Sequence, residues 1–309
     1  MVQVIKRRFC RVTCVCLLVI TALANIPLVI FADVNGGEYQ QQYEYLVSEI
    51  ADDYEDELES LEIGNEQEAR TSLFYRWRQR GGFFGTDLGF EFYRAFIRDN
   101  RYQLFFAGMR TTITLSALAL TIGTVIGLIV TFLSMSKIKY LRWISTVYLD
   151  IIRGTPLMVQ AMLWYFVFLS GLGLPRLLIG GIAFGFNSGA YLSEIFRAGI
   201  MSIDKGQTEA GRSLGMTRFQ TMRLIVLPQA IKNVLPAIAN EYIVLIKETA
   251  IVFVIAVPDI MRAANVVISL TFSPMMPLLG ATVMYYVIIK TLSIFFRWME
   301  KRLRKADAR

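Results

Sequence analysis

The chain has 309 residues, 55% of them apolar, and a mean hydropathy of +0.47, which is too apolar for a soluble domain of this length. It contains no histidine, so catalysis by imidazole and metal sites ligated by histidine are excluded. Its three cysteines all lie in the first apolar run, so the polar segments hold no residues for a disulfide framework.

The net charge of +7 is unevenly distributed along the chain. Residues 33–69 contain thirteen acidic residues and no Lys or Arg, whereas residues 70–309 contain 28 basic and 12 acidic residues. The acidic stretch is predicted to be solvated and partly disordered. The basic residues cluster at the ends of apolar runs, without aromatic stacking platforms. This pattern indicates membrane topology and no nucleic-acid partner.

The N-terminal third of the chain is predicted to hold a signal peptide or membrane anchor, an external lead-in and an interfacial helix. Residues 1–32 have a basic start and an apolar stretch that ends at Ala32, which suits signal-peptidase cleavage. They form either a cleaved signal peptide or an uncleaved anchor, and both place the acidic lead-in, 33–89, outside the cytoplasm. Residues 90–107 include seven Phe or Tyr together with arginines, which predicts a helix in the membrane interface.

Apolar runs of about 20 residues predict membrane spans. Five strong runs and a weaker one at 12–31 are present, the strong ones being 111–134, 143–170, 177–200, 234–257 and 278–296. With residue 33 outside, the basic connection after 134, the segment 201–233 and the basic tail all fall in the cytoplasm, as the positive-inside rule requires. The arginines of the external segment before the span at 111 are an exception, but this segment is longer than about 60 residues, and such segments cross largely regardless of charge. The predicted fold is an all-α membrane protein with five spans and an N-terminal signal or anchor helix.

Small residues in the first long run predict a close helix contact. Gly123 and Gly127 form a GxxxG pattern, whose usual role is to let two helices approach. The pattern leaves open whether the second helix belongs to the same chain or to another subunit.

Polar residues inside the runs are candidates for a substrate pathway, because ionisable groups in membrane spans tend to face the bundle interior. The candidates share helical faces or neighbouring positions, and they are Asn187, Tyr191, Glu194, Glu241, Lys247 and Glu248. One interpretation is a polar site for a zwitterion, and the alternative is internal pairing of Glu194 or Glu241 with Arg197 or Arg153. A break near Lys247–Ala250 is also expected. Arg153 and Pro156 predict a helix kink and pairing of the arginine with a buried acid.

The polar segment 201–233 contains signals for two short helices. Residues 205–214 favour a first helix, and Gly215 can take the left-handed conformation that ends it. Thr217 and Gln220 form a capping box, so a second helix is predicted from Arg218. It should place Phe219, Met222 and Ile225 or Val226 near one face, with Pro228 interrupting it and Pro236 beginning the next span. A soluble partner with a groove could bind this pair of helices.

The stretch Gly206–Ser213 is close to a phosphate-binding loop, G-x-x-x-x-G-K-[ST]. Arg212 replaces the lysine, and an apolar run precedes the stretch where the motif requires a strand. ATP binding by this chain is therefore not expected.

The same segment resembles the cytoplasmic signature of type I ABC importer membrane subunits: Glu-Ala-Ala, three residues, Gly, nine residues and Ile-x-Leu-Pro. The matching residues are Glu209, Ala210, Gly211, Gly215, Ile225, Leu227 and Pro228. Gly211 stands where that family usually has alanine, which is expected to loosen the first helix by up to about 1 kcal/mol.

Further motifs resemble the polar amino-acid branch of that family. They are RGTPLMVQ at 153–160, NSGAYLSEIFRAGI at 187–200, KGQ at 205–207 and LPAIANEYIVLIKETAIVFVIAVPDI at 235–260. The resemblance covers about 90–305, the expected transmembrane domain, and leaves 1–89 outside. Some relatives carry a fused binding domain in that position, but this lead-in is too short for one.

The resemblance implies a permease subunit, with no catalytic residues and no metal or cofactor of its own, that imports an amino acid across a prokaryotic cytoplasmic membrane. ATP and Mg²⁺ would be bound by a separate ATPase subunit that contacts 201–233. Further expected partners are a second permease subunit, identical or homologous, an extracytoplasmic amino-acid-binding protein and lipid. Two alternatives are a membrane receptor with the acidic segment as sensor, which would need an output domain, and a secondary transporter, which would normally need more spans and an inverted repeat.

Overall fold

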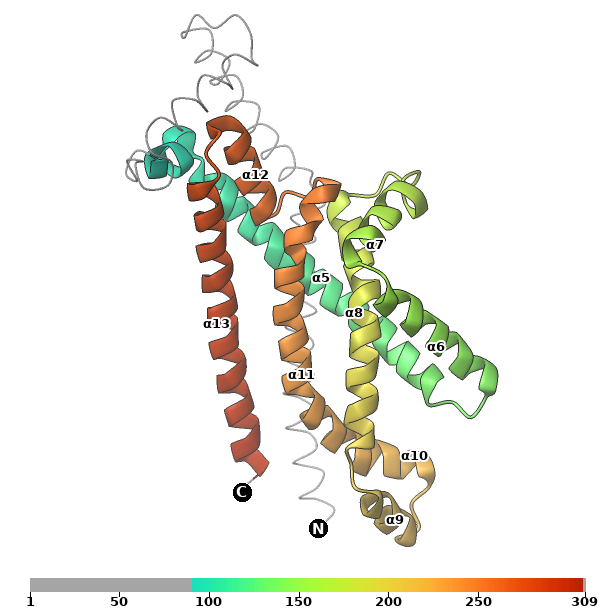
Figure 1. The fold of residues 1–309 in the computed structure, drawn as a ribbon. Helices are drawn as coiled ribbons and strands as arrows, with labels where there is room; N and C mark the ends of the chain where they lie inside the picture. The colour runs from blue at the N-terminus through green and yellow to red at the C-terminus, as the bar shows by residue number, and fades with distance from the viewer. Residues whose placement is uncertain (1–90, 308–309) are drawn as a thin grey trace, which may run out of the picture. The chain divides into compact units, whose positions relative to one another are not determined.

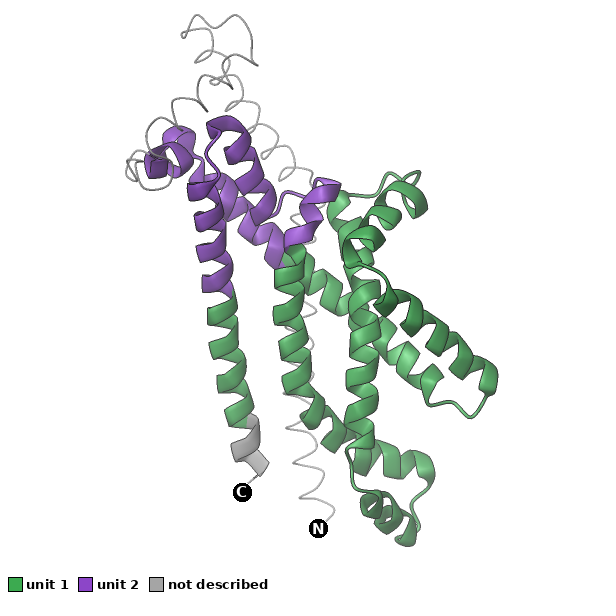
Figure 2. Ribbon diagram, viewed as in Figure 1, with its two compact units in different colours: residues 1–30, 114–249, 289–309 green, residues 31–113, 250–288 purple. Residues whose placement is uncertain are grey.

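The computed structural model describes residues 91–307, and within that range every regular element is a helix (Figure 1). These residues form two compact units (Figure 2). Unit 1 holds Thr114–Thr249 and the chain from Ile289 onward, and unit 2 holds the chain up to Ile113 together with Ala250–Ile288. The predicted signal or anchor at 1–32 and the acidic lead-in, 33–89, lie outside the described residues and stay predictions.

The described elements are α-helices of very different lengths with short π or 3-10 segments among them. In chain order they are η2 (Tyr93–Ile97), η3 (Arg98–Asn100), α5 (Tyr102–Ser134), α6 (Lys139–Gly154), α7 (Leu157–Leu163), η4 (Trp164–Phe168), α8 (Arg176–Met201), α9 (Lys205–Ser213), α10 (Arg218–Thr221), η5 (Met222–Val226), α11 (Leu227–Glu248), η6 (Thr249–Ile255), α12 (Ile260–Thr271) and α13 (Met275–Asp307).

By length and composition, two of the described helices could cross a membrane: α5 and the Met275–Arg302 part of α13. A third crossing results if α6 and the α7–η4 helix, which are bent by 107° relative to each other, are taken as one broken span. The helices α8 and α11 have 26 and 22 residues, enough to span, but they carry more polar residues. The all-α prediction is confirmed for the described part of the chain, and the number of five spans stays a prediction.

In unit 1, α8 packs against α6, α7 and α11, and its glycines pack against α5. The glycine contact consists of small residues on α8 facing branched side chains on α5, namely Gly181, Gly185 and Gly189 against Leu118, Ile122 and Ile126. A Cβ at Gly185 would lie 2.6 Å from Ile122 Cγ2, and one at Gly123 of α5 would lie 3.2 Å from the Gly185 carbonyl oxygen. The close packing predicted from GxxxG is thus a contact within the chain.

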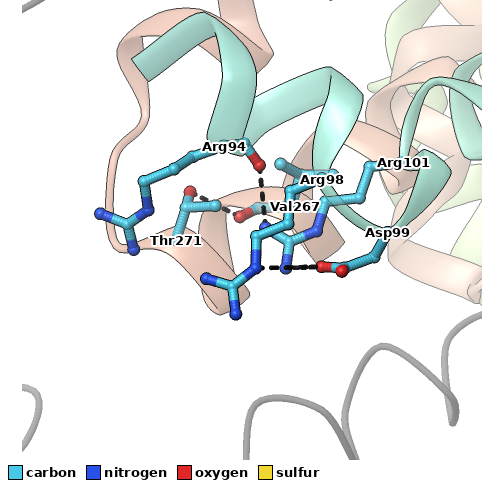
Figure 3. Close-up of polar contacts among 6 residues, drawn as sticks. All are labelled: Arg94, Arg98, Asp99, Arg101, Val267 and Thr271. Carbon is cyan, nitrogen blue, oxygen red and sulfur yellow. Dashed lines mark hydrogen bonds and ion pairs between the residues drawn. The ribbon is translucent and has the colours of Figure 1, made fainter. Parts of the chain in front are cut away.

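In unit 2, a buried arginine organises the turn that leads into α5 (Figure 3). Arg101 is 4% exposed, its Nη1 donates to the Arg94 carbonyl at 2.9 Å, and its Nη2 donates to Asp99 Oδ2 at 2.7 Å. Burial lowers the pKa of Arg101, and the charge of Asp99 opposes that shift. Asp99 and Asn100 both have left-handed φ, at 54° and 51°, which these two residue types tolerate best.

This turn changes the prediction of one interfacial helix over 90–107. The chain forms a π turn and a 3-10 turn, η2 and η3, and then enters α5 at Tyr102, nine residues before the predicted start of the span at 111. Phe92, Tyr93 and Ile97 are about half exposed, as interfacial side chains would be.

A buried carboxylate holds the start of α12 in unit 2. Asp259 is fully buried, its Oδ1 accepts from the Arg262 N–H at 2.8 Å, and its Oδ2 accepts from the Tyr285 hydroxyl of α13 at 3.3 Å. Gly108 of α5 lies so close that a Cβ there would be 2.7 Å from the Asp259 carbonyl. Burial raises the pKa of this carboxyl from its ordinary value of 3.8 to about 7.

Candidate transport pathway and coupling segment

The predicted polar face of α8 exists, but its three residues have different surroundings. Asn187, Tyr191 and Glu194 follow one another at one-turn intervals along the helix. Asn187 is buried, Tyr191 is exposed and Glu194 is half-buried. The face therefore changes from an internal contact to an open surface over two turns.

The open end of this face carries an ion pair with an aromatic neighbour. Arg153 Nη1, at the end of α6, donates to Glu194 Oε1 at 2.6 Å, and its guanidinium carbon lies 5.9 Å from the centre of the Tyr191 ring. The two charged side chains are 44% and 37% exposed, so they face outward from this chain. A cation, an anion and a ring at one place match the groups of a free amino acid, whose carboxylate and ammonium each need an opposite charge.

This geometry corrects one expectation about Arg153 and decides between the two partners expected for Glu194. Its partner is Arg153 of α6 and not Arg197, which lies one turn further along α8 with an exposed side chain. Arg153 does pair with an acid, as predicted, but this acid is half-buried and not buried. The expected kink is confirmed, because α6 ends at Gly154 and the chain bends by 107° around Pro156.

A residue that the sequence analysis did not single out occupies the inside of this bend. Gln160 of α7 is 6% exposed, its Nε2 donates to the Ile152 carbonyl at 2.7 Å, and its Oε1 accepts from Asn187 Nδ2 at 3.0 Å. An amide one turn after a proline in an apolar run is the available signal. This signal does not reveal the role of Gln160, which depends on its partners Ile152 and Asn187 in the fold.

The acids of α11 belong to other surroundings. Glu241 is 8% exposed and accepts a hydrogen bond from Ser188 Oγ of α8 at 2.8 Å, which joins the two helices. Glu248 is the last residue of α11, and the chain continues there as the 3-10 segment η6, so the predicted break near Lys247 occurs at the helix end. Lys247 itself is exposed. The contacts of the described residues thus place Glu194 and Glu241 in separate polar clusters.

The segment 201–233 folds locally as its signals predict. Asp204 caps α9 by accepting from the Gly206 N–H at 2.6 Å, and Gly215 follows α9 with a φ of +79°. In the capping box, Gln220 N–H donates to Thr217 Oγ1 at 3.2 Å and Thr217 N–H donates to Gln220 Oε1 at 2.8 Å. Figure 1 shows α9 and α10 at the end of α8, where α11 begins.

Two predictions for this segment need correction. Pro228 is the second residue of α11, which is reached from α10 through the π segment η5 without a break, and Pro236 lies inside α11 where a span start was expected. Along the predicted face exposure falls from 72% at Phe219 to 4% at Val226, and the common face itself stays a prediction. The stretch Gly206–Ser213, which is close to a phosphate-binding loop, lies within the helix α9.

Gly211 has a packing role in the segment. A Cβ there would lie 2.8 Å from Ile225 Cδ1 and 2.9 Å from Thr221 Cγ2. The missing methyl group therefore lets α9 lie close to α10 and η5, whatever the glycine costs in helix propensity. The compact hairpin that results exposes Leu214 (82%) and Phe219 (72%) on either side of the Gly215 turn.

Between the two long helices α8 and α11 lies a pair of short helices with an exposed apolar tip, a surface type that is typical of contacts with another subunit. The family described as binding-protein-dependent transport system inner membrane component matches residues 123–305, more than half of the chain, so the chain belongs to this family. The resemblance inferred from the sequence is thereby confirmed. The chain is a transport permease subunit, and membership implies a separate ATPase subunit, on which ATP is hydrolysed, and a partner permease.

Individual relatives match most of their own length. A Rickettsia bellii protein named as the permease of a glutamine transport system is 39% identical over 198 residues, which are 63% of this chain and 91% of the relative. The arginine transport system permease protein ArtQ of Bacillus subtilis is 38% identical over 65% of this chain and 92% of its own. A crystal structure described as an amino acid ABC transporter with histidines is 42% identical, with a TM-score of 0.63, over 67% of this chain and 98% of that one.

Proposed function

We propose that the chain is the permease of an ABC importer for an amino acid in a prokaryotic cytoplasmic membrane. A separate ATPase subunit holds ATP and Mg²⁺, a second permease completes the pathway, and an extracytoplasmic amino-acid-binding protein delivers the substrate. The observation that carries the proposal is the α9–α10 hairpin with its exposed Leu214 and Phe219, because it combines the family signature with a protein-docking surface. The glutamine and arginine relatives support the substrate class.

In the proposed complex the ATPase contacts the hairpin. The coupling residues are those of the signature, namely Glu209, Ala210, Gly211, Gly215, Ile225, Leu227 and Pro228. Glu209 lies on α9 with an exposed side chain, available to a partner, whereas the buried Gly211 and the left-handed Gly215 shape the hairpin. Glu209 would act through contact with the ATPase, and the two glycines would act through the shape that they give the hairpin.

The substrate passes the Arg153–Glu194 pair in this proposal. Arg153 receives the carboxylate and Glu194 the ammonium group, and Tyr191 stacks beside them, each charge exchanging its internal partner for the substrate. Because the pair is more than a third exposed, the substrate can reach it without unfolding of the chain. Glu241, Lys247 and Glu248 stay candidates for the pathway further along α11.

The test is ATP-driven uptake by the complete complex in vesicles, with the binding protein outside and radiolabelled glutamine, arginine and histidine as probes. Glu194→Gln removes one charge of the pair and should lower uptake strongly, while hydrolysis of ATP stimulated by the binding protein persists. Asp150→Asn is the matched control, because Asp150 is an exposed acid of α6 one turn before Arg153. Wild-type uptake by Glu194→Gln, or collapse of its basal ATPase activity, would contradict the site.

A further inference from the structure

The bend between α6 and α7 creates a hydrogen-bonding problem for the backbone. Pro156 has no N–H, so the carbonyl of Ile152, four residues earlier, loses its helical donor. Thr155 is extended, with φ −123° and ψ 146°, as residues before proline prefer, and α6 ends there. In an apolar membrane each carbonyl left without a donor costs several kcal/mol. The bend is stable only if other groups supply the missing donors.

The side chain of Gln160 supplies them. Its Nε2 donates to the Ile152 carbonyl at 2.7 Å and to the Thr155 carbonyl at 3.0 Å. Thr155 Oγ1 donates in turn to the Ile151 carbonyl at 2.8 Å. The amide of a residue in α7 thus replaces the backbone donor that Pro156 lacks and joins the two arms of the bend.

The other end of the same amide is held by α8. Asn187 Nδ2 donates to Gln160 Oε1 at 3.0 Å, and both side chains are almost fully buried, at 5% and 6% exposed. The backbone carbonyl of the adjacent residue of α8, Phe186, accepts a hydrogen bond from the Tyr148 hydroxyl of α6, and the Phe186 ring packs at a tilt of 42° against Trp164 of η4 with ring centres 4.7 Å apart. One short stretch of α8 therefore holds both arms of the bend.

The same stretch fixes the position of the ion pair. Arg153 directly follows Ile152, whose carbonyl Gln160 holds, and Glu194 lies two turns, about 10 Å, beyond Asn187 on α8. We propose that Gln160 and Asn187 are positioning residues, which lock the α6–α7 bend onto α8 and so place Arg153 opposite Glu194. Asn187, first considered a pathway residue, then acts through Arg153 without touching the substrate. The effect on transport rests on the proposed function, whereas the locking of the bend does not.

The conformational test uses spin labels across the bend in the complete complex. Single cysteines replace Trp143 on α6 and Val167 on η4, both exposed, in a background without the three native cysteines. Pulsed electron paramagnetic resonance should give one narrow distribution of the distance between the two labels in the parent protein, which carries only these two cysteines. Gln160→Leu should broaden this distribution and shift it to longer distances, and so should Asn187→Leu, which removes fewer hydrogen bonds. Gln103→Leu, which replaces an exposed amide of α5, should leave it unchanged.

The transport test separates positioning from substrate contact. Gln160→Leu should raise the KM for the amino acid about tenfold, the effect of losing one to two hydrogen bonds, with little change in maximal rate. In an Arg153→Gln background the same substitution should raise KM no further, because the residue acts through Arg153.

Four outcomes overturn the proposal. The first is that the spin-label distances are unchanged in both Gln160→Leu and Asn187→Leu, and the second is that the distances change while the KM of Gln160→Leu does not. The third is that Gln160→Leu raises KM equally in the Arg153→Gln background. The fourth is that Gln160→Leu fails to assemble while Asn187→Leu shows wild-type distances and transport. If the wild-type complex imports none of the three amino acids, the proposed function fails, and the spin-label distances still decide whether Gln160 locks the bend.

Discussion

Replacing Gly185 by alanine should force α8 away from α5. The new methyl group would lie 2.6 Å from Ile122 Cγ2 and 2.7 Å from Ile122 Cβ, whereas ordinary contacts begin at 3.4 Å. Ile122 Cβ is fixed to the backbone and cannot rotate aside, so the helices must separate by roughly 0.7 Å at this point. Overpacking of this kind costs about 1–3 kcal/mol, and a gap of this size forfeits about a quarter to a half of each neighbouring dispersion contact.

The assay is the melting temperature of the purified complex in detergent. Gly154→Ala is the matched control, because Gly154 also lies in a helix and a Cβ there meets nothing within 4 Å. Alanine gains about 1 kcal/mol of helix propensity inside α8 and less at Gly154, the last residue of α6, so lower melting of Gly185→Ala must come from the contact. We expect Gly185→Ala to melt several degrees below Gly154→Ala, and Gly185→Val lower still. Equal melting of Gly185→Ala and Gly154→Ala would refute the glycine packing between α5 and α8.

Three further predictions concern coupling, topology and pH. Glu209→Lys and Gly215→Pro should abolish ATP-driven uptake without preventing membrane insertion, and wild-type uptake and ATPase activity in both would disprove the docking role. In a chain without native cysteines, a cysteine at Ser60 should react with an impermeant maleimide in intact cells and one at Ser202 should not; the reverse pattern would invert the topology. Because burial raises the pKa of Asp259 from 3.8 to about 7, its carboxyl keeps a proton that the unfolded chain releases, so stability should fall as the pH rises from about 4 to about 7. Asp259→Asn keeps a side-chain acceptor for the helix cap and should flatten this slope in thermal melts between pH 4 and 8, and an unchanged slope would assign the effect to another group.

Local signals in the sequence predicted local structure well. Gly215 and the Thr217–Gln220 box define helix ends through contacts within four residues, and Pro156 ends α6 through the missing N–H and the strain it places on Thr155. Such effects need no knowledge of the rest of the fold. The span start predicted at Pro236 is wrong, because membrane helices tolerate proline where neighbouring groups satisfy the freed carbonyl.

The ion pair and the Gln160 contacts could not be predicted in the same way. Arg153 and Glu194 are 41 positions apart, and Gln160 and Asn187 are 27 apart, so their meeting depends on how α6, α7 and α8 pack. For Glu194 the sequence leaves two possible partners, Arg197 one turn away on the same helix and the distant Arg153. Packing of α6 onto α8 through Tyr148 and Phe186 selects the distant one.

The short connection between α8 and α9 has a mechanical consequence. Only Ser202, Ile203 and Asp204 separate Met201 from Lys205, and Asn233 of α11 donates a hydrogen bond to Ser202 at 2.9 Å. Gly199 of α8 also packs so closely against Val234 of α11 that no Cβ would fit between the two helices. A force applied to the hairpin therefore displaces α8 as a whole helix, and Glu194 lies on this helix only about 10 Å from its end at Met201. One continuous helix thus joins the hairpin to Glu194, so a small tilt at the hairpin end moves Glu194 relative to Arg153 of α6 without any signal passing through side chains.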